Sequence, residues 1–454
     1  MRKKIVFLLP FLLMLGGCDD DSLLWKIPRD FSVTGPGLVR EYVNTEDGPA
    51  SGEILSDTAE NGQKEKTQDT EDSQDVENLQ GPENLQDAEN PQPENDFLYD
   101  GAFEYAAQSL NEAELTWYLD IKQVLGNFGE NVRLDRAALE AGCDEEDIDR
   151  IFQCVLNDHP ELFYVEGYSY TRYTRGDKIT AVVFSGTYSI DRETAESRRC
   201  EIETAAAEIL SGIDKDADQY TKVKYVYDTI IRETDYDLSA PDNQKIYSEL
   251  VGKRSVCQGY AKAAQYLLNR LGVDCTLVLG TVELGEGQGL PTRQEGHAWN
   301  LVRVDGNYYY VDVTWGDASY SRQDGVSAED IGMPEINYDY LNVTTEELLK
   351  SHTLGESIPM PQCIATEANY YFREGALFMT YDRDQMQALF DRAREENRYD
   401  VTVKCTDREC YMEVLTALVD NHEIFRYLEE PDAVTVAYAR NDNQMSLTFW
   451  VTNE

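Results

Sequence analysis

The sequence is short of basic residues, with 40 Lys and Arg against 86 Asp and Glu in 454 residues and a formal net charge of -46. Such an excess of negative charge repels phosphate backbones and anionic lipid headgroups. The composition therefore excludes nucleic acid as an expected partner. We interpret the surplus of acidic residues as a solubility feature, because charged surfaces far from neutrality resist association.

Histidine, the commonest protein ligand of catalytic metal ions, is also scarce. There are only four histidines, and none forms a helical His pair with a nearby Glu, so no catalytic metal-ligand set is visible. Asp214, Asp216 and Asp218 have the spacing that opens a calcium loop, but Gln219 and Tyr225 occupy the positions that need Gly and Glu. We predict an acidic turn there, no metal and no other cofactor.

Paired cysteines are missing as well. The nine cysteines form no Cys-x-x-Cys pair, and only Cys405 and Cys410 lie close together in the sequence. Neither a zinc ribbon nor a dense disulfide framework is predicted. Any catalytic cysteine must stay unpaired.

Long apolar runs are absent except at the start of the chain. Three basic residues precede the short apolar run Ile5 to Leu15, and the small residues before Cys18 complete a pattern that resembles a lipoprotein signal peptide with its lipobox. The run is shorter than the roughly 20 apolar residues that span a bilayer. We predict a signal peptide over residues 1–18, lipidation of Cys18, and an extracytoplasmic protein held to the bacterial cell membrane by its lipid anchor only.

Large apolar side chains are nearly lacking between Asn44 and Asp96, where a Glu-Asn-Leu-Gln motif occurs twice. Such a segment buries too little surface to offset its chain entropy. We predict that residues 19–96 form a disordered acidic stalk, extended by its own repulsion.

The rest of the chain has the patterns of an α+β protein. In an N-terminal α+β region, 97–212, we expect helices from Phe97 to about Gly126 and from Asp144 to Asn157, then strands Leu162 to Thr174 and Lys178 to Tyr188. The Arg-Gly-Asp tripeptide 175–177 between these strands is interpreted as a hairpin turn. Helices Asp191 to Leu210 and Ala217 to Glu233 lead into a domain at 213–360. A small α+β domain at 365–454 is expected to begin with strand Ala376 to Tyr381, helix Arg383 to Glu395 and strand Val401 to Cys405.

Cys257 has the features of a helix-start nucleophile. Ser255 is the expected N-cap, and the apolar residues that follow share one helical face as far as Gly272. Unpaired N–H groups and the positive end of the helix dipole stabilise a thiolate in a first turn, and they can also meet a developing oxyanion. A small buried cysteine without function is the alternative.

His297 and Asp312 stand on either side of Asp305-Gly306, a strong hairpin signal between two alternating strands, the second expected over Asn307 to Trp315. If those two residues form the loop, His297 lies diagonally from Asp312 on the same face. A three-residue loop would put them on opposite faces.

Three blocks of sequence, Val256 to Ala261, His297 to Asn300 and Tyr310 to Trp315, resemble the transglutaminase-like superfamily in its order Cys, His, Asp. The resemblance covers about Tyr220 to Thr353. It implies a papain-like core in which a helix bearing the cysteine packs on an antiparallel sheet bearing the other two residues. It also implies Cys257 as the nucleophile, His297 as general base and Asp312 as the residue that orients the imidazole. Asp317 is the second choice for the third role, and Tyr247 and Gln258 are weak candidates for a second oxyanion donor.

These features predict a cell-surface cysteine enzyme that transfers acyl groups from amide bonds through a thioester. The partner would be a protein or peptide substrate, cell-wall peptide among the candidates, with water or an amine as acceptor. The alternative is a non-catalytic surface lipoprotein that uses the same fold to bind peptide or glycan. Nothing in the sequence specifies an oligomeric state.

Overall fold

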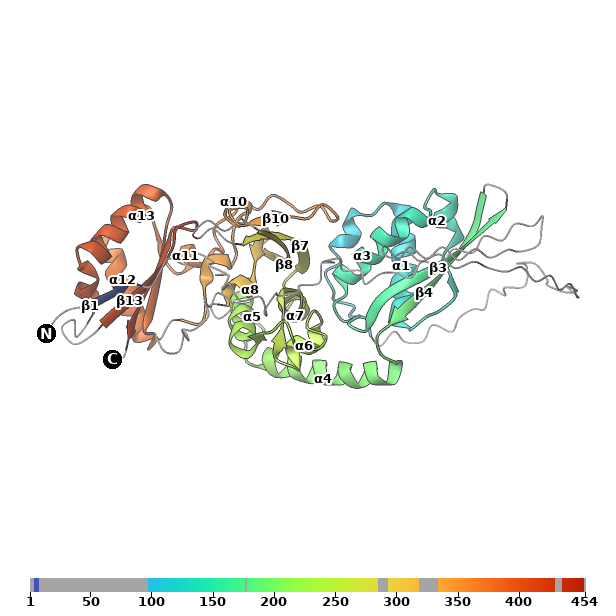
Figure 1. The fold of residues 1–454 in the computed structure, drawn as a ribbon, viewed down its shortest axis with the longest axis horizontal. Coiled ribbons are helices and arrows are strands. Elements are labelled where there is room, and N and C mark those ends of the chain that lie inside the picture. The colour runs from blue at the N-terminus through green and yellow to red at the C-terminus, as the bar shows by residue number, and fades with distance from the viewer. Residues whose placement is uncertain are drawn as a thin grey trace, which may run out of the picture.

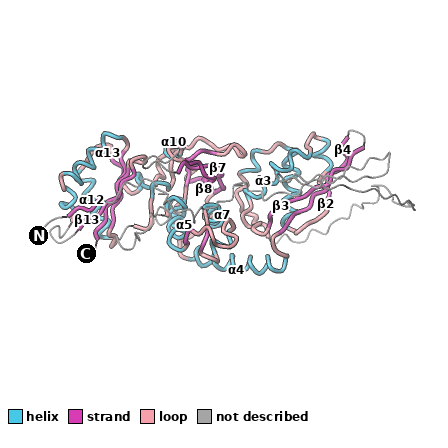
Figure 2. Tube along the Cα trace, viewed as in Figure 1, coloured by secondary structure: helices cyan, strands magenta, loops and turns pink. Residues whose placement is uncertain are grey.

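A computed structural model describes residues 4–7, 97–175, 178–284, 293–317, 334–428 and 435–452. Its strands gather in three main sheets, which lie in a row along the long axis of the molecule (Figures 1 and 2). The predicted stalk, Cys18 and the tip of the Arg-Gly-Asp turn lie outside the described residues. No helix within the described ranges has the length and apolar character needed to cross a membrane.

The N-terminal part combines helices with a three-stranded sheet of order β2-β4-β3. The helix expected from Phe97 begins instead at Glu112, where Asn111 and Glu114 form a capping box. The residues before it are held elsewhere, because the N–H groups of Ala106 and Ala107 donate to the Asp158 carboxylate. The elements are a 3-10 turn Ala106–Ser109, α1 Glu112–Gly126, β2 Val132–Arg133, α2 Arg136–Glu140, a 3-10 turn Glu145–Asp147, α3 Ile148–Asp158, β3 Val165–Arg175 and β4 Lys178–Tyr188.

Two capped helices lead from this part into the centre of the molecule. Asp191 caps the long helix α4, which runs along the lower side of the N-terminal and central parts (Figure 1), and Asp218 caps α5. The segment around Asp214 and Asp216 is an acidic turn, as predicted, in which the Asp214 carboxylate accepts from the Asp216 N–H. The elements are α4 Arg192–Ser211, α5 Gln219–Glu233, β5 Asp235–Tyr236, α6 Ile246–Leu250 and β6 Arg254–Ser255.

The central part packs helix α7 (Cys257–Arg270) on a four-stranded antiparallel sheet of order β10-β7-β8-β9. Its strands are β7 Cys275–Leu284, β8 Arg293–Val304, β9 Asn307–Val311 and β10 His352–Leu354. Val304 pairs with Asn307, and Asp305 and Gly306 between them both have positive φ, so the predicted two-residue turn is confirmed. The α+β class and the papain-like arrangement of helix on sheet are therefore present.

β9 ends at Val311, earlier than expected, because Asp312 caps a short helix, α8 (Val313–Gly316). The expected strand to Trp315 is therefore wrong in its last four residues. The chain then continues through a 3-10 turn, Tyr338–Tyr340, and helices α10 Thr345–Leu348 and α11 Tyr370–Arg373.

The C-terminal part is a second α+β unit, which begins with strand, helix and strand in the predicted order. Its first strand is shorter than expected. The elements are β11 Leu377–Phe378, α12 Arg383–Glu395, β12 Asp400–Cys405, α13 Arg408–Leu415, a π-helical turn Thr416–Asp420, a 3-10 turn Glu423–Tyr427, β13 Thr435–Asn441 and β14 Ser446–Thr452. Within the predicted signal peptide, the backbone of Lys4–Phe7 (β1) lies parallel to β13 at the sheet edge.

Buried polar contacts fix the outer parts to the centre. Asn157, at the end of α3, donates to the Leu277 carbonyl of β7 at 3.0 Å and accepts from the Thr276 hydroxyl at 2.9 Å. On the other side, Asp339 accepts from Asn441 and Ser446 of the C-terminal part at 2.9 and 2.7 Å. Both outer parts thus contact elements that surround the candidate site.

Candidate active site

Cys257 is the first residue of α7, so its backbone N–H is one of the unpaired donors of a helix start. Its thiol is free and only 3% of the residue is exposed. Ser255 is not the N-cap that we expected. It lies in β6, where its hydroxyl donates to the Asn243 carbonyl at 2.7 Å, and Val256 takes the cap position without a side-chain hydrogen bond.

β8 brings His297 to Cys257. Ala298, the neighbour of His297, packs with Cys257, Ala261 and Leu277 in one small apolar cluster between α7 and the sheet. The imidazole Nε2 of His297 lies 2.7 Å from Asp312 Oδ2, which leaves Nδ1 as the ring nitrogen for the thiol. The Cys257 side chain is among the groups that raise the pKa of His297, so the thiol acts on this ring as a near neighbour.

Asp312 is completely buried and follows β9 directly. Its Oδ1 accepts the N–H of Trp315 at 3.0 Å, and its own N–H donates to the Tyr340 carbonyl at 3.0 Å. Backbone contacts on both sides therefore fix the carboxylate with Oδ2 against His297. The expected diagonal pairing of His297 and Asp312 across the hairpin is confirmed.

The electrostatics of the pair favour a charged imidazole. Burial opposes protonation of His297, but the charge and hydrogen bond of Asp312 outweigh it and raise the pKa of His297 to about 10. Burial also acts against the ionised Asp312, yet the two histidines beside it hold the pKa of this carboxyl well below its usual range. Asp312 is thus ionised wherever the protein is folded near neutral pH.

The second histidine at this carboxylate is His352, which sequence reasoning did not identify as a site residue. It lies on β10 at the far edge of the sheet, and its Nε2 is 2.9 Å from Asp312 Oδ2, the same oxygen that His297 uses. The only sequence signal was the rarity of histidine. A strand of three residues, 40 positions after Asp312, gives no pattern that points back to it.

Aromatic rings enclose the two histidines. Trp299, Trp315 and Tyr340 have ring centroids 5.0, 4.7 and 5.8 Å from that of His352, and both tryptophans also contact the His297 ring. The low polarity of these walls strengthens the hydrogen bonds to Asp312.

The residues that were second choices for the third triad role and for the oxyanion donor make contacts elsewhere. Asp317 accepts from the Tyr260 hydroxyl at 3.1 Å, so Asp312 is the carboxylate that contacts His297. The Tyr247 hydroxyl donates to Glu201 of α4 at 3.0 Å, and Gln258 Oε1 accepts from Lys262 at 3.5 Å. The Tyr247 hydroxyl proton is thus used away from the candidate site, whereas the contact of Gln258 uses only its oxygen.

His297, Asp312 and His352 also have the composition of a metal-ligand set, with donor atoms within 4.8 Å of one another. The short nitrogen-to-oxygen distances are those of charge-assisted hydrogen bonds between the three residues. An ion bound to both Nε2 atoms would have to displace the two protons that hold these contacts together. The donor set therefore fits a hydrogen-bonded cluster better than a resident metal.

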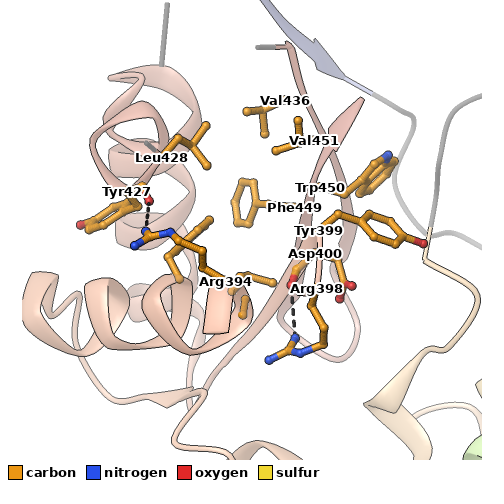
Figure 3. A pocket seen from close by; sticks show the side chains of 13 residues that line it. Arg394, Arg398, Tyr399, Asp400, Tyr427, Leu428, Val436, Phe449, Trp450 and Val451 are labelled. Atoms are coloured by element: carbon orange, nitrogen blue, oxygen red, sulfur yellow. Dashed lines mark hydrogen bonds between the residues drawn. The ribbon is translucent and has the colours of Figure 1, made fainter. Parts of the chain in front are cut away.

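A separate hollow of about 300 Å³ lies in the C-terminal part (Figure 3). Its lining is mainly apolar and aromatic, with Arg394 and Arg398 bonded to the carbonyls of Tyr427 and Asp400. No cysteine or histidine is among its lining residues. It therefore has no cysteine–histidine pair of its own.

Comparisons with known proteins place the centre of the chain among transglutaminase-like sequences. Residues 204–313 match the family model described as the transglutaminase-like superfamily. The chain is similar to the human Kyphoscoliosis peptidase, with 30% identity over 105 residues, and to the mouse Kyphoscoliosis peptidase, with 26% over 133 residues. These matches cover 21% and 27% of this chain but only 15% and 20% of the human and mouse proteins.

Among solved structures, the crystal structure of a transglutaminase (TGase) covers 36% of this chain and 48% of its own, at 15% identity and a TM-score of 0.22. The class defined by the central fold and the family match is thus a transglutaminase-like core within an α+β chain. The chain spans a fifth or less of the length of the curated relatives that it matches.

Proposed function

We propose that this chain is a cysteine enzyme that transfers acyl groups from amide bonds, with Cys257 as nucleophile, His297 as general base and Asp312 as the orienting carboxylate. One observation carries the proposal. The imidazole of His297 bonds the buried Asp312 carboxylate at 2.7 Å through Nε2, and Cys257, the first residue of α7, packs against Ala298, the neighbour of His297.

The steps follow from this geometry. The Cys257 thiol passes its proton to Nδ1 of His297, and the thiolate attacks the carbonyl carbon of a substrate amide. The resulting oxyanion is stabilised by the Cys257 N–H at the positive end of α7. When the carbon–nitrogen bond breaks, His297 returns the proton to the departing amine, and a thioester remains on Cys257.

Water or a second amine then cleaves the thioester. Water gives a carboxylic acid and therefore peptidase or amidase activity, whereas an amine gives a new amide and therefore cross-linking. We favour hydrolysis of a protein or peptide substrate. The peptidase names of the similar mouse and human proteins support this choice by analogy.

The test uses the soluble chain with a mixture of peptides and a labelled primary amine, read by mass spectrometry. Hydrolysis adds water at the cleaved bond, and cross-linking adds the label. Cys257→Ser should abolish both products. Cys200→Ser, which replaces an exposed thiol, is the matched control and should leave activity unchanged. Products that persist in the Cys257 variant would refute the mechanism.

Reactivity of the thiol separates an enzyme from a binding protein of the same fold. We expect iodoacetamide to alkylate Cys257 rapidly at pH values where ordinary thiols react slowly, and His297→Ala to remove this advantage. A wild-type thiol that reacts like the exposed Cys200 at every pH would instead support the non-catalytic alternative.

We further propose that the protein is anchored outside the cell membrane through a lipid on Cys18. The basic start, the apolar run and the small residues before the cysteine support this location. Cells expressing the chain and fed labelled palmitate should incorporate label into it, and Cys18→Ala should not. Label that persists in this variant would contradict the anchor.

A further inference from the structure

We propose that His352 is a positioning residue of the proposed acyl-transfer site. Its ring holds Asp312 in place and stabilises the negative charge of that carboxylate. The inference rests on the proposed function of Cys257, His297 and Asp312, and it adds a fourth residue to that set.

Two histidines share one carboxylate oxygen. Asp312 Oδ2 lies 2.7 Å from His297 Nε2 and 2.9 Å from His352 Nε2, and the exposed fraction of each of the three side chains is 3% or less. An ionised carboxylate can only accept hydrogen bonds, so both nitrogens must carry a proton. Asp312 therefore has donors from three elements, namely β8, β10 and the backbone of α8.

The surroundings of His352 favour its neutral form with the proton on Nε2. Ser351 Oγ lies 2.9 Å from Nδ1 and can donate to it, which leaves Nε2–H for Asp312. Burial lowers the pKa of His352, while Asp312 and the Leu348 carbonyl favour its protonated form. His297 and Tyr340 are the other titratable groups that face the ring.

A neutral donor at this oxygen has a definite chemical effect. It stabilises the ionised carboxylate without adding a full positive charge beside the imidazolium of His297. It also prevents Asp312 from turning, because Oδ1 is fixed by Trp315 N–H and Oδ2 by two rings. His297 is then held with Nδ1 toward Cys257 and is less basic than a histidine beside an unshared carboxylate.

The C-terminal part of the chain helps to fix the position of His352. It follows α10, whose Glu347 pairs with Lys404 of β12 at 2.8 Å and accepts from Gln444 at 3.2 Å through its carbonyl. The C-terminal part thus supports the segment that carries His352.

The test measures alkylation of Cys257 by iodoacetamide against pH, read by peptide mass, in the full chain. His352→Phe keeps the ring volume and removes the donor. We expect the rate at neutral pH to fall by about tenfold, because Asp312 and the His297 ring are then held less firmly, and the upper limb of the profile to move to higher pH, because His297 becomes more basic. His352→Gln, whose Nε2–H can reach Asp312, should restore most of the wild-type profile.

His422, an exposed histidine far along the chain, provides the matched control, and His422→Gln should leave the profile unchanged. Ser351→Ala should shift the profile in the same direction as His352→Phe, but less. If His352→Phe folds and has the wild-type profile, the inference is wrong although the proposed function stands. If wild-type Cys257 has no enhanced reactivity at all, the proposed function itself fails.

A second measurement avoids dependence on a variant. With only four histidines in the chain, nitrogen-detected NMR resolves each ring. We expect a proton on Nε2 of His352 across neutral pH. A spectrum in which that nitrogen lacks its proton would overturn the proposal.

Discussion

At the scale of single residues, the site depends on a carboxylate that contacts two histidines. Asp312 is completely buried, and its hydrogen bonds decide which nitrogen of His297 is left for the thiol. Asp317 lies five residues on and bonds Tyr260 instead. The two carboxylates therefore have separate tasks, which substitution can distinguish.

Asp312→Asn keeps the size of the side chain but presents an amide where two N–H donors need an acceptor. We expect the catalytic rate, or the alkylation rate of Cys257, to fall by roughly 10²- to 10⁴-fold, as when the aspartate of a Ser-His-Asp triad is replaced. Asp317→Asn is the matched control and should change reactivity by less than about twofold, within the range of a substitution outside the site. Equal losses in both variants would contradict the assignment of Asp312.

At the scale of elements, a glycine lets β10 lie close against β7 in the central sheet. A Cβ on Gly280 of β7 would collide with the Thr353 carbonyl of β10 and would meet the Trp299 ring at 2.6 Å. The absence of a side chain there is what allows His352, one residue before Thr353, to reach Asp312.

Gly280→Ala should therefore push β10 outward. We expect a loss of about 1 to 3 kcal/mol in the free energy of unfolding, as for other overpacked sites, measured by urea titration. It should also alter the pH profile of Cys257 alkylation in the same way as loss of His352. Gly306→Ala strains the hairpin turn at φ +85° with no atom near its Cβ, so it should destabilise the fold without that change in profile.

The junction between α3 and the sheet is a second feature at this scale. Asn157→Ala removes one hydrogen bond to the Leu277 carbonyl and one from the Thr276 hydroxyl, both buried. We expect a loss of about 1 to 3 kcal/mol in unfolding free energy, because two buried groups lose their partner. Thr116→Ala, whose hydroxyl bonds an exposed carbonyl of α1, should change it by less than about 0.5 kcal/mol. A loss no larger than that of the control would show that this contact contributes little.

At the scale of the whole molecule, a buried ionic cluster in the N-terminal part sets a pH range for stability. His159 lies between Glu161, at 2.9 Å from Nδ1, and Glu104, at 3.2 Å from Nε2. Burial opposes the charge on His159, but hydrogen bonds to Glu104 and Glu161 raise its pKa from 6.5 to about 9. Burial raises the pKa of the adjacent Asp158 from 3.8 to about 7, whereas its contact with His159 lowers that of Glu104 from 4.5 to about 2.

The signs of these shifts predict the pH dependence. The raised pKa of His159 contributes stability that is fully present below pH 6.5 and is lost as the pH rises through about 9. The raised pKa of Asp158 likewise contributes stability that is fully present below pH 3.8 and is lost as the pH rises through about 7. Glu104 contributes above pH 4.5 and loses this as the pH falls through about 2. Urea unfolding of wild type and His159→Gln should therefore differ more at pH 5 than at pH 9, by about 1 to 3 kcal/mol. An equal difference at both pH values would contradict this account.

The sequence by itself determined the local features. Periodicity and capping residues predicted most helices, and Asp305-Gly306 determined the hairpin register that puts His297 diagonally across from Asp312, since that turn leaves the strands one pairing. The cap of α7 depended on a tertiary contact, because Ser255 bonds the Asn243 carbonyl instead of its own helix. The helix start at Glu112 and the end of β9 follow local caps, Asn111 with Glu114 and Asp312, which compete with the apolar periodicity. The contact of His352 with Asp312 was decided by tertiary structure alone. Its strand pairs with β7 across about 70 residues of chain, and no local pattern encodes which side chain a remote carboxylate will accept.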